Sequence, residues 1–109
     1  MAITVSGSTG VSRVYDYQTP STGFSYTFAS PTQVLILSPA TTLATGTIIT
    51  PSSPADGMTI TISSTQTITS LTFSANSGQS ISNAITTLAL GSFASYLYRA
   101  TNTTWYRVG

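Results

Sequence analysis

The chain contains no cysteine, histidine, lysine or glutamate among its 109 residues. Without cysteine it has no disulfide, no thiolate metal site and no cysteine nucleophile. The missing imidazole, amine and glutamate side chains are also those that most often act as acids, bases or nucleophiles in enzymes. A calcium site would have to combine an aspartate with backbone oxygens and water. We therefore expect neither a metal nor a cofactor.

Two carboxylates remain, and a glycosidase pair or an aspartic dyad requires only two. Asp56 directly precedes Gly57, and an Asp-Gly pair is a common turn device. Asp16 follows closely after Arg13, so a local charge pair or a loop position explains it. We therefore predict that the protein is not an enzyme.

Charge is scarce throughout the chain. Charged residues make up 5% of it, whereas roughly 25% is typical of soluble domains. Three arginines without a lysine cannot form the basic stripe that binds nucleic acid, so we expect no nucleic-acid partner. Residues 34–37, the longest strongly apolar run, are far too few to span a membrane. Residues 1–10 have neither a basic segment nor a long apolar stretch, so we expect no secretory signal.

Hydroxyl groups take the place of the missing charges. The chain has 22 threonines and 18 serines, and its formal net charge is +1. A surface of hydroxyl and backbone groups gives little electrostatic repulsion between copies. The composition therefore favours a protein that works by assembling with other proteins.

Apolar and polar residues alternate with a period of two in several runs rich in threonine, isoleucine and aromatic residues, which is typical of β-strands. In the clearest run, Met58, Ile60 and Ile62 fall on one side of the predicted strand. Residues 34–37 are apolar throughout and predict a strand buried on both faces. Turn signals separate the runs at the short intervals of a sandwich or jelly roll. We predict one all-β domain, an antiparallel jelly-roll-like β-sandwich over residues 13–109.

Three segments give more specific expectations. Near Ser70 the apolar residues change from one side of the predicted strand to the other, which predicts a β-bulge or a sheet-to-sheet bend over residues 68–71. Residues 82–90 have some helical spacing, but their β-branched residues favour strand or loop. Residues 1–12 are predicted to be either an N-terminal arm that adds a strand to a neighbouring subunit or the first strand of the domain itself.

Aromatic residues are numerous for a small β-domain, and they have two interpretations. Some must fill the core, whereas exposed ones could contact a protein partner or stack on neutral sugars. The candidates for an interface are Tyr15, Tyr17, Tyr26, Tyr96, Trp105 and Tyr106.

The second half of the chain has a recurring arrangement of short motifs. A proline-containing loop precedes Asp56 and Gly57, an alternating strand follows, and residues 75–78 form a turn. The arrangement closes with residues 96–98 and 102–105. Residues 51–109 thereby resemble a β-rich segment of tailed-bacteriophage virion proteins, including capsid decoration proteins and tail-fibre domains.

This resemblance implies a β-sandwich that forms trimers on a virion and performs no chemistry. Tail fibres are generally long chains with shaft repeats, so a chain of this length favours a capsid decoration, or cement, protein. Such a protein would be made in the host cytoplasm, bind the outer capsid as a homotrimer and stabilise contacts between major capsid subunits. The alternative is a tail-fibre or receptor-binding module that binds a host glycan.

Overall fold

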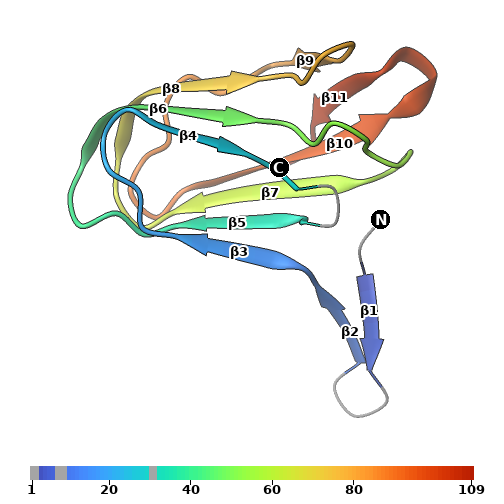
Figure 1. The fold of residues 1–109 in the computed structure, drawn as a ribbon, viewed down its shortest axis with the longest axis horizontal. Helices are drawn as coiled ribbons and strands as arrows, with labels where there is room; N and C mark the ends of the chain where they lie inside the picture. The colour runs from blue at the N-terminus through green and yellow to red at the C-terminus, as the bar shows by residue number, and fades with distance from the viewer. Residues whose placement is uncertain (1–2, 7–9, 30–31) are drawn as a thin grey trace.

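The structure, a computed structural model, describes residues 3–6, 10–29 and 32–109. In these ranges the regular structure consists of strands and one 3-10 turn, so the predicted all-β class is confirmed (Figure 1). The elements in chain order are β1 (Ile3–Ser6), β2 (Gly10–Arg13), β3 (Tyr15–Gln18), β4 (Phe24–Thr27), β5 (Val34–Leu37), β6 (Leu43–Ile49), β7 (Thr59–Ser64), β8 (Ile68–Ser74), β9 (Ser80–Ser82), β10 (Phe93–Arg99), η1 (Ala100–Asn102) and β11 (Thr104–Arg107).

The chain winds between two facing sheets. The larger sheet has the order β3-β5-β7-β10-β11-β9, and the smaller sheet has the order β4-β6-β8. From β3 to β8 each strand therefore lies in the sheet opposite its predecessor, and three successive coils form a flattened, solenoid-like arrangement (Figure 1). After β8 the chain adds β9, β10 and β11 to the larger sheet.

This winding corrects the predicted antiparallel pairing. Of the eight pairs between described strands, the five formed by β3-β5, β5-β7, β4-β6, β6-β8 and β9-β11 are parallel. Consecutive strands cross to the opposite sheet, so each pairs with the next strand but one, which runs in the same direction. Alternation with period two identifies a strand with one covered face but does not determine the direction of its neighbour.

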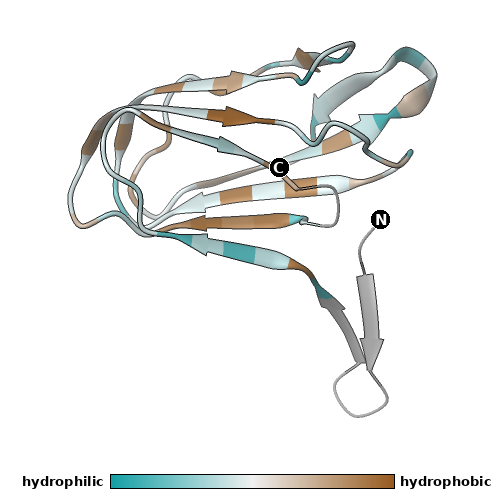
Figure 2. Ribbon diagram, viewed as in Figure 1, coloured by the Kyte–Doolittle hydropathy of each residue, from teal (hydrophilic) through white to brown (hydrophobic). Residues whose placement is uncertain are grey.

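The core lies between the two sheets. Met58, Ile60 and Ile62 are fully buried, as the alternation predicts. The most apolar stretches lie on central strands, including β5, β6 and β7 (Figure 2). Strand β5 differs from its prediction, because Leu35 and Leu37 are buried whereas its other two residues are only half-buried on the outer side.

The parity switch in β8 is real, but the predicted bulge is wrong. Strands β6 and β8 keep one register on both sides of Ser70, with Thr45 opposite Ser70 and Gly46 opposite Leu71. Each strand has two consecutive exposed residues at this level. In both strands the buried residues therefore change to the other side of the alternation at the same level, and neither strand contains an extra, unpaired residue.

Residues 83–92 form an irregular strap that follows β9. The strap runs beside β8, where Ile68 and Leu88 exchange two backbone hydrogen bonds and the Leu71 amide donates to Thr86 at 2.9 Å. The prediction of strand or loop for residues 82–90 is confirmed. The strap pairs with the β8 edge of the smaller sheet, whereas β3 and β4 are the edge strands at the other end of the solenoid.

The N-terminal segment forms a separate hairpin. Strands β1 and β2 pair antiparallel with each other in a two-stranded sheet, and neither of them belongs to the two larger sheets. The hairpin extends away from the sheets (Figure 1). Residues 1–2 and 7–9 of the predicted arm lie outside the described residues, and the addition of this arm to a neighbouring subunit stays a prediction.

Candidate interaction surface

The outer face of the larger sheet is the most distinctive surface of the described chain. Strand register places its outward residues in rows, because residues opposite one another in paired strands point to the same side. One row contains Tyr15, Val34, Thr61 and Ser95. The next row contains Tyr17, Ile36, Ser63 and Phe93.

A third row, from β7 to β11, completes this surface, which we call the apolar face. Its members are Tyr15, Tyr17, Val34, Ile36, Thr59, Thr61, Ser63, Phe93, Ser95, Leu97 and Tyr106. Tyr15 is 65% exposed, Tyr17 56% and Phe93 59%. Large apolar side chains on a single sheet face are thus left uncovered.

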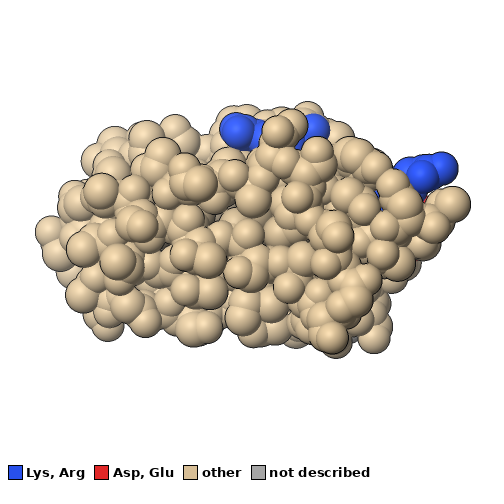
Figure 3. All heavy atoms as spheres, turned by 90° about the horizontal axis from the view of Figure 1, so that it is seen from above, with Lys and Arg blue, Asp and Glu red and all other residues tan. Residues whose placement is uncertain are grey.

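The rows of the apolar face have no charged member, and Arg99, which follows on the same side of β10, lies at their margin. The polar groups of the rows are hydroxyls, and two of these, Thr61 Oγ1 and Ser95 Oγ, hydrogen bond to each other at 2.9 Å. The side of the molecule in Figure 3 is likewise almost free of charge, with arginines near its upper and right margins. A partner could therefore cover the apolar face without burying an ion.

The structure divides the aromatic candidates from the sequence into two groups. Tyr15, Tyr17 and Tyr106 are exposed on the apolar face. Tyr106 also accepts a hydrogen bond from Asn102 Nδ2 at 2.6 Å. Tyr96 and Trp105 have 0% exposure, which corrects their selection as interface residues.

Tyr96 is held in the core by its hydroxyl group. The hydroxyl donates to the Asn83 carbonyl at 2.7 Å and accepts from the Ile85 amide at 3.0 Å. Burial raises the pKa of Tyr96, while the Ile85 hydrogen bond and the positive charge of Arg107 oppose the rise. Both hydrogen bonds tie the strap to β10, so this tyrosine has a structural role.

The buried N–H group of Trp105 also has a hydrogen-bond partner. Its indole nitrogen donates to Gln79 Oε1 at 2.9 Å, and its ring packs on Tyr98 with centroids 5.0 Å apart. A buried indole needs such an acceptor, because an unpaired N–H away from water is costly. Tyr26, the remaining candidate, is half-buried and points between the sheets.

Sequence reasoning missed four apolar members of the surface: Val34, Ile36, Phe93 and Leu97. The first two belong to a fully apolar run, which gave no sign that one of its faces is only half-covered. Phe93 begins β10 directly after a turn, and isolated apolar residues in that position have no periodic signature. Their shared position emerges only from the register of β3, β5, β7 and β10 in the larger sheet.

The two carboxylates have separate structural partners. Asp16 lies within β3, where it accepts hydrogen bonds from Tyr26 and Gln18, so the predicted charge pair or loop position does not describe it. Asp56 accepts from the Ala100 amide at 2.9 Å, and the following Gly57 has φ +80°, as the expected turn requires.

Among the described residues, no cluster of three or more acidic, histidine or cysteine side chains could hold a metal ion. The described chain also has no helix long and apolar enough to cross a membrane.

The chain matches no known protein family, and no characterised protein or solved structure is detectably similar to it. Its surface is suited to contact with another molecule through apolar and hydroxyl groups.

Proposed function

We propose that this protein is a structural component of a tailed-bacteriophage virion. In this proposal it is a capsid decoration protein that binds the outer shell as a homotrimer and stabilises contacts between major capsid subunits. The observation that carries the proposal is the uncharged apolar face. The resemblance of residues 51–109 to phage virion proteins supplies the biological setting.

The side chains of the apolar face support an interaction role more than its size does. Strands lie about 4.8 Å apart and residues rise about 3.3 Å along a strand, so the outward rows cover on the order of 300 Å². The largest apolar patch on a typical monomer is about this size, and it is often functional. Tyr15, Tyr17 and Phe93 supply the large side chains that anchor protein contacts.

A second copy of this chain is the occupant that we assign to the apolar face. Three copies around a three-fold axis would bring three such faces together. Because the face carries no charge, identical copies meet without Coulomb repulsion and without burying an unpaired ion. The contact would also be insensitive to salt.

The outer side of the smaller sheet would remain free for the capsid. Its strands present hydroxyl side chains to solvent, including Ser25, Thr27, Thr45 and Thr72. A trimer carries three copies of every remaining surface, and simultaneous contacts with several capsid subunits increase the overall affinity. Such a clamp would hold neighbouring subunits together.

The oligomeric state tests the trimer directly. Native mass spectrometry of the purified chain should give a trimer, and Tyr17→Lys should give a monomer because it places a charge in the apolar face. Thr72→Lys, on the exposed outer side of β8, is the matched control and should remain trimeric. A monomeric parent chain, or a trimeric Tyr17→Lys variant with an unchanged circular dichroism spectrum, would contradict this assignment.

The capsid role requires a measurement on particles. Virions that lack the protein should release their DNA at lower temperature than complete virions, and added protein should restore the difference. Unchanged capsid stability together with lost attachment to the host would contradict the capsid role.

A second function is favoured by the spacing of Tyr15 and Tyr17. Both are exposed on one side of β3, and aromatic rings presented by a charge-poor surface can stack on neutral sugars. This is the alternative of a tail-fibre or receptor-binding module for a host glycan. A glycan array should then give binding that Tyr15→Ala abolishes, whereas the capsid decoration protein should bind no glycan.

A further inference from the structure

Strand β3 has a backbone edge that pairs with no other strand of the described structure. It stands at the end of the larger sheet and pairs on one side with β5. The carbonyls of Val14 and Gln18 accept from amides on the β5 side, that of Gln18 at 2.8 Å from Ser38. Backbone groups along an edge strand alternate in direction, so the N–H and C=O groups of Tyr15 and Tyr17 point away from β5. These two residues therefore form a free edge.

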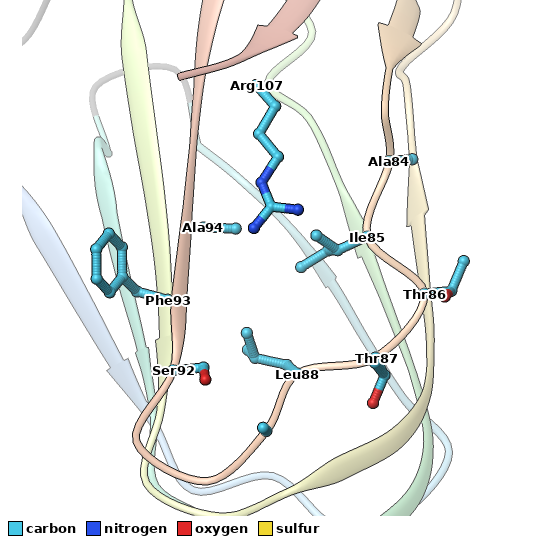
Figure 4. Close-up of a pocket in the computed structure, with 10 residues that line it drawn as sticks. Ala84, Ile85, Thr86, Thr87, Leu88, Ser92, Phe93, Ala94 and Arg107 are labelled. Carbon is cyan, nitrogen blue, oxygen red and sulfur yellow. The ribbon is translucent and has the colours of Figure 1, made fainter. Parts of the chain in front are cut away.

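The opposite end of the solenoid is closed by the chain itself. The strap covers the β8 edge through the backbone hydrogen bonds of Ile68 and Leu71. Ile85 and Leu88 of the strap are buried, and in Figure 4 both point from the strap toward β10. Proteins commonly cover strand edges in this way, because an exposed edge is a template for pairing with another strand. The free edge of β3 lacks such a cover among the described residues.

The N-terminal hairpin precedes β3 directly but cannot cover its edge. Only Val14 separates β2 from β3, and one residue is too short a loop for β2 to reverse and lie beside β3. In β1, Ile3 lies opposite Arg13, so the described part of β1 ends level with the end of β2 and does not reach β3. The hairpin extends away from both larger sheets (Figure 1). A strand that pairs with the free edge must therefore come from another molecule.

The hairpin is itself incomplete as a sheet. In the part of the chain that the structure describes, β1 and β2 pair with each other and with no third strand. An isolated two-stranded hairpin is at best marginally stable in water, so it needs a further strand. Each copy thus has one hairpin without a sheet and one free sheet edge. Copies that exchange these elements head to tail satisfy both, and three such contacts can close a ring.

We propose that β1 of one copy pairs with the free edge of β3 in the next copy. Both strands have four residues. Ile3 and Val5 alternate with hydroxyl residues in β1, just as Tyr15 and Tyr17 alternate with polar residues in β3. Because β1 has no charged residue, its addition extends the apolar face without adding a charge. This proposal rests on the assembly of copies proposed above, but not on the capsid role.

NMR of the assembled full chain tests the pairing. The amides of Tyr15 and Tyr17 should exchange with solvent at least tenfold more slowly than in an unstructured chain, although their own chain offers them no partner. An assembly of isotope-labelled and unlabelled copies should give NOEs between the Tyr17 amide of a labelled copy and β1 of an unlabelled copy. NOEs from Tyr17 to β3 of the other copy would instead indicate symmetric pairing of two β3 strands, and would overturn the proposal.

Tyr15→Pro and Tyr15→Ala are a matched pair of variants. Both remove the ring from the apolar face, but only proline removes the N–H group at the free edge. The fold of each copy should tolerate this proline, because that N–H group takes no part in pairing with β5. Sedimentation equilibrium should give a dissociation constant of the assembly at least tenfold higher for Tyr15→Pro than for Tyr15→Ala. Equal constants for the two folded variants would overturn the proposal.

The outcomes distinguish this proposal from the proposed trimer. A trimer in which the Tyr15 and Tyr17 amides exchange freely would overturn the strand exchange and leave the trimer standing. A dimer or a larger assembly with protected amides and NOEs to β1 would support the strand exchange and contradict the trimer. A monomeric chain would overturn both.

Discussion

The hydroxyl of Tyr26 donates a 2.8 Å hydrogen bond to the carboxylate of Asp16, joining β4 of the smaller sheet to β3 of the larger one. Asp16 also accepts from Gln18 Nε2 at 2.9 Å. Strands β3 and β4 are the edge strands at one end of the solenoid. The three side chains therefore form a polar closure where the space between the sheets reaches the end of the coils.

Tyr26→Phe should lower the free energy of unfolding by about 1–2 kcal/mol, because it removes a hydrogen bond to a half-buried charged group. Urea denaturation at pH 7 measures the change. Tyr17→Phe is the control, since the Tyr17 side chain is exposed on the same edge of the molecule and should change the free energy little. Equal effects of the two substitutions would contradict the closure.

Alkaline pH gives a second prediction for the same group. Burial, followed by the hydrogen bond to Asp16 and its negative charge, raises the pKa of Tyr26 above its ordinary value of 10.0. Above about pH 10 the unfolded chain loses this proton while the folded chain retains it, so the free energy of unfolding should fall as pH rises. The fall should be shallower in Tyr26→Phe when unfolding is measured from pH 9 to pH 11. An identical slope in the two proteins would be inconsistent with the raised pKa.

Gln79 should be among the most sensitive polar positions. Its Oε1 accepts from Thr50 Oγ1 at 2.6 Å and from Trp105 Nε1 at 2.9 Å, and its Nε2 donates to the Pro51 carbonyl at 2.8 Å. Gln79→Leu keeps the approximate volume but leaves these buried groups without partners, so we expect a loss of about 2–4 kcal/mol. Gln66→Leu should cost much less, because no hydrogen bond of the Gln66 side chain is found in the described structure. Fluorescence of the single tryptophan can follow both unfolding transitions.

The sequence reveals individual strands better than their arrangement. The alternation around Ile60 identifies β7 and its buried side, and the Asp56-Gly57 pair identifies the turn before it. The pairing of β3, β5 and β7 is not visible in the sequence, because the segments that connect these strands differ in length and the sequence contains no repeat. A strand with one covered face has the same alternation in parallel and antiparallel sheets.

The apolar face was only partly predictable for a related reason. Tyr17 and Tyr96 both lie in alternating runs. Where both sides of a strand carry apolar side chains, alternation does not tell which side is buried in the core. Burial of Tyr96 depends on Asn83 and Ile85, which reach it from the strap. That contact joins segments whose relation is determined by tertiary structure, so the core and surface aromatics separate only in three dimensions.

Gly46 should not tolerate a side chain. A Cβ atom at this position would overlap the ring of Phe24, which lies over the glycine on the neighbouring strand. Gly46→Ala should therefore destabilise the protein by about 1–3 kcal/mol, the usual cost of overpacking. Phe24→Leu in the same chain should recover part of this loss. Additive effects of the two substitutions in a double-mutant cycle would show that the ring is not the obstacle.

Tyr96→Phe should loosen the strap selectively. The substitution removes the hydroxyl that donates to Asn83 and accepts from the Ile85 amide, so a buried N–H loses its partner. We expect a loss of about 2 kcal/mol and faster hydrogen exchange at the Ile85 amide. Tyr98→Phe is the matched control on β10, because Tyr98 is also buried but its hydroxyl has no hydrogen bond in the described structure. It should leave exchange at Ile85 unchanged, and similar acceleration in both variants would mean that the Tyr96 hydroxyl does not anchor the strap.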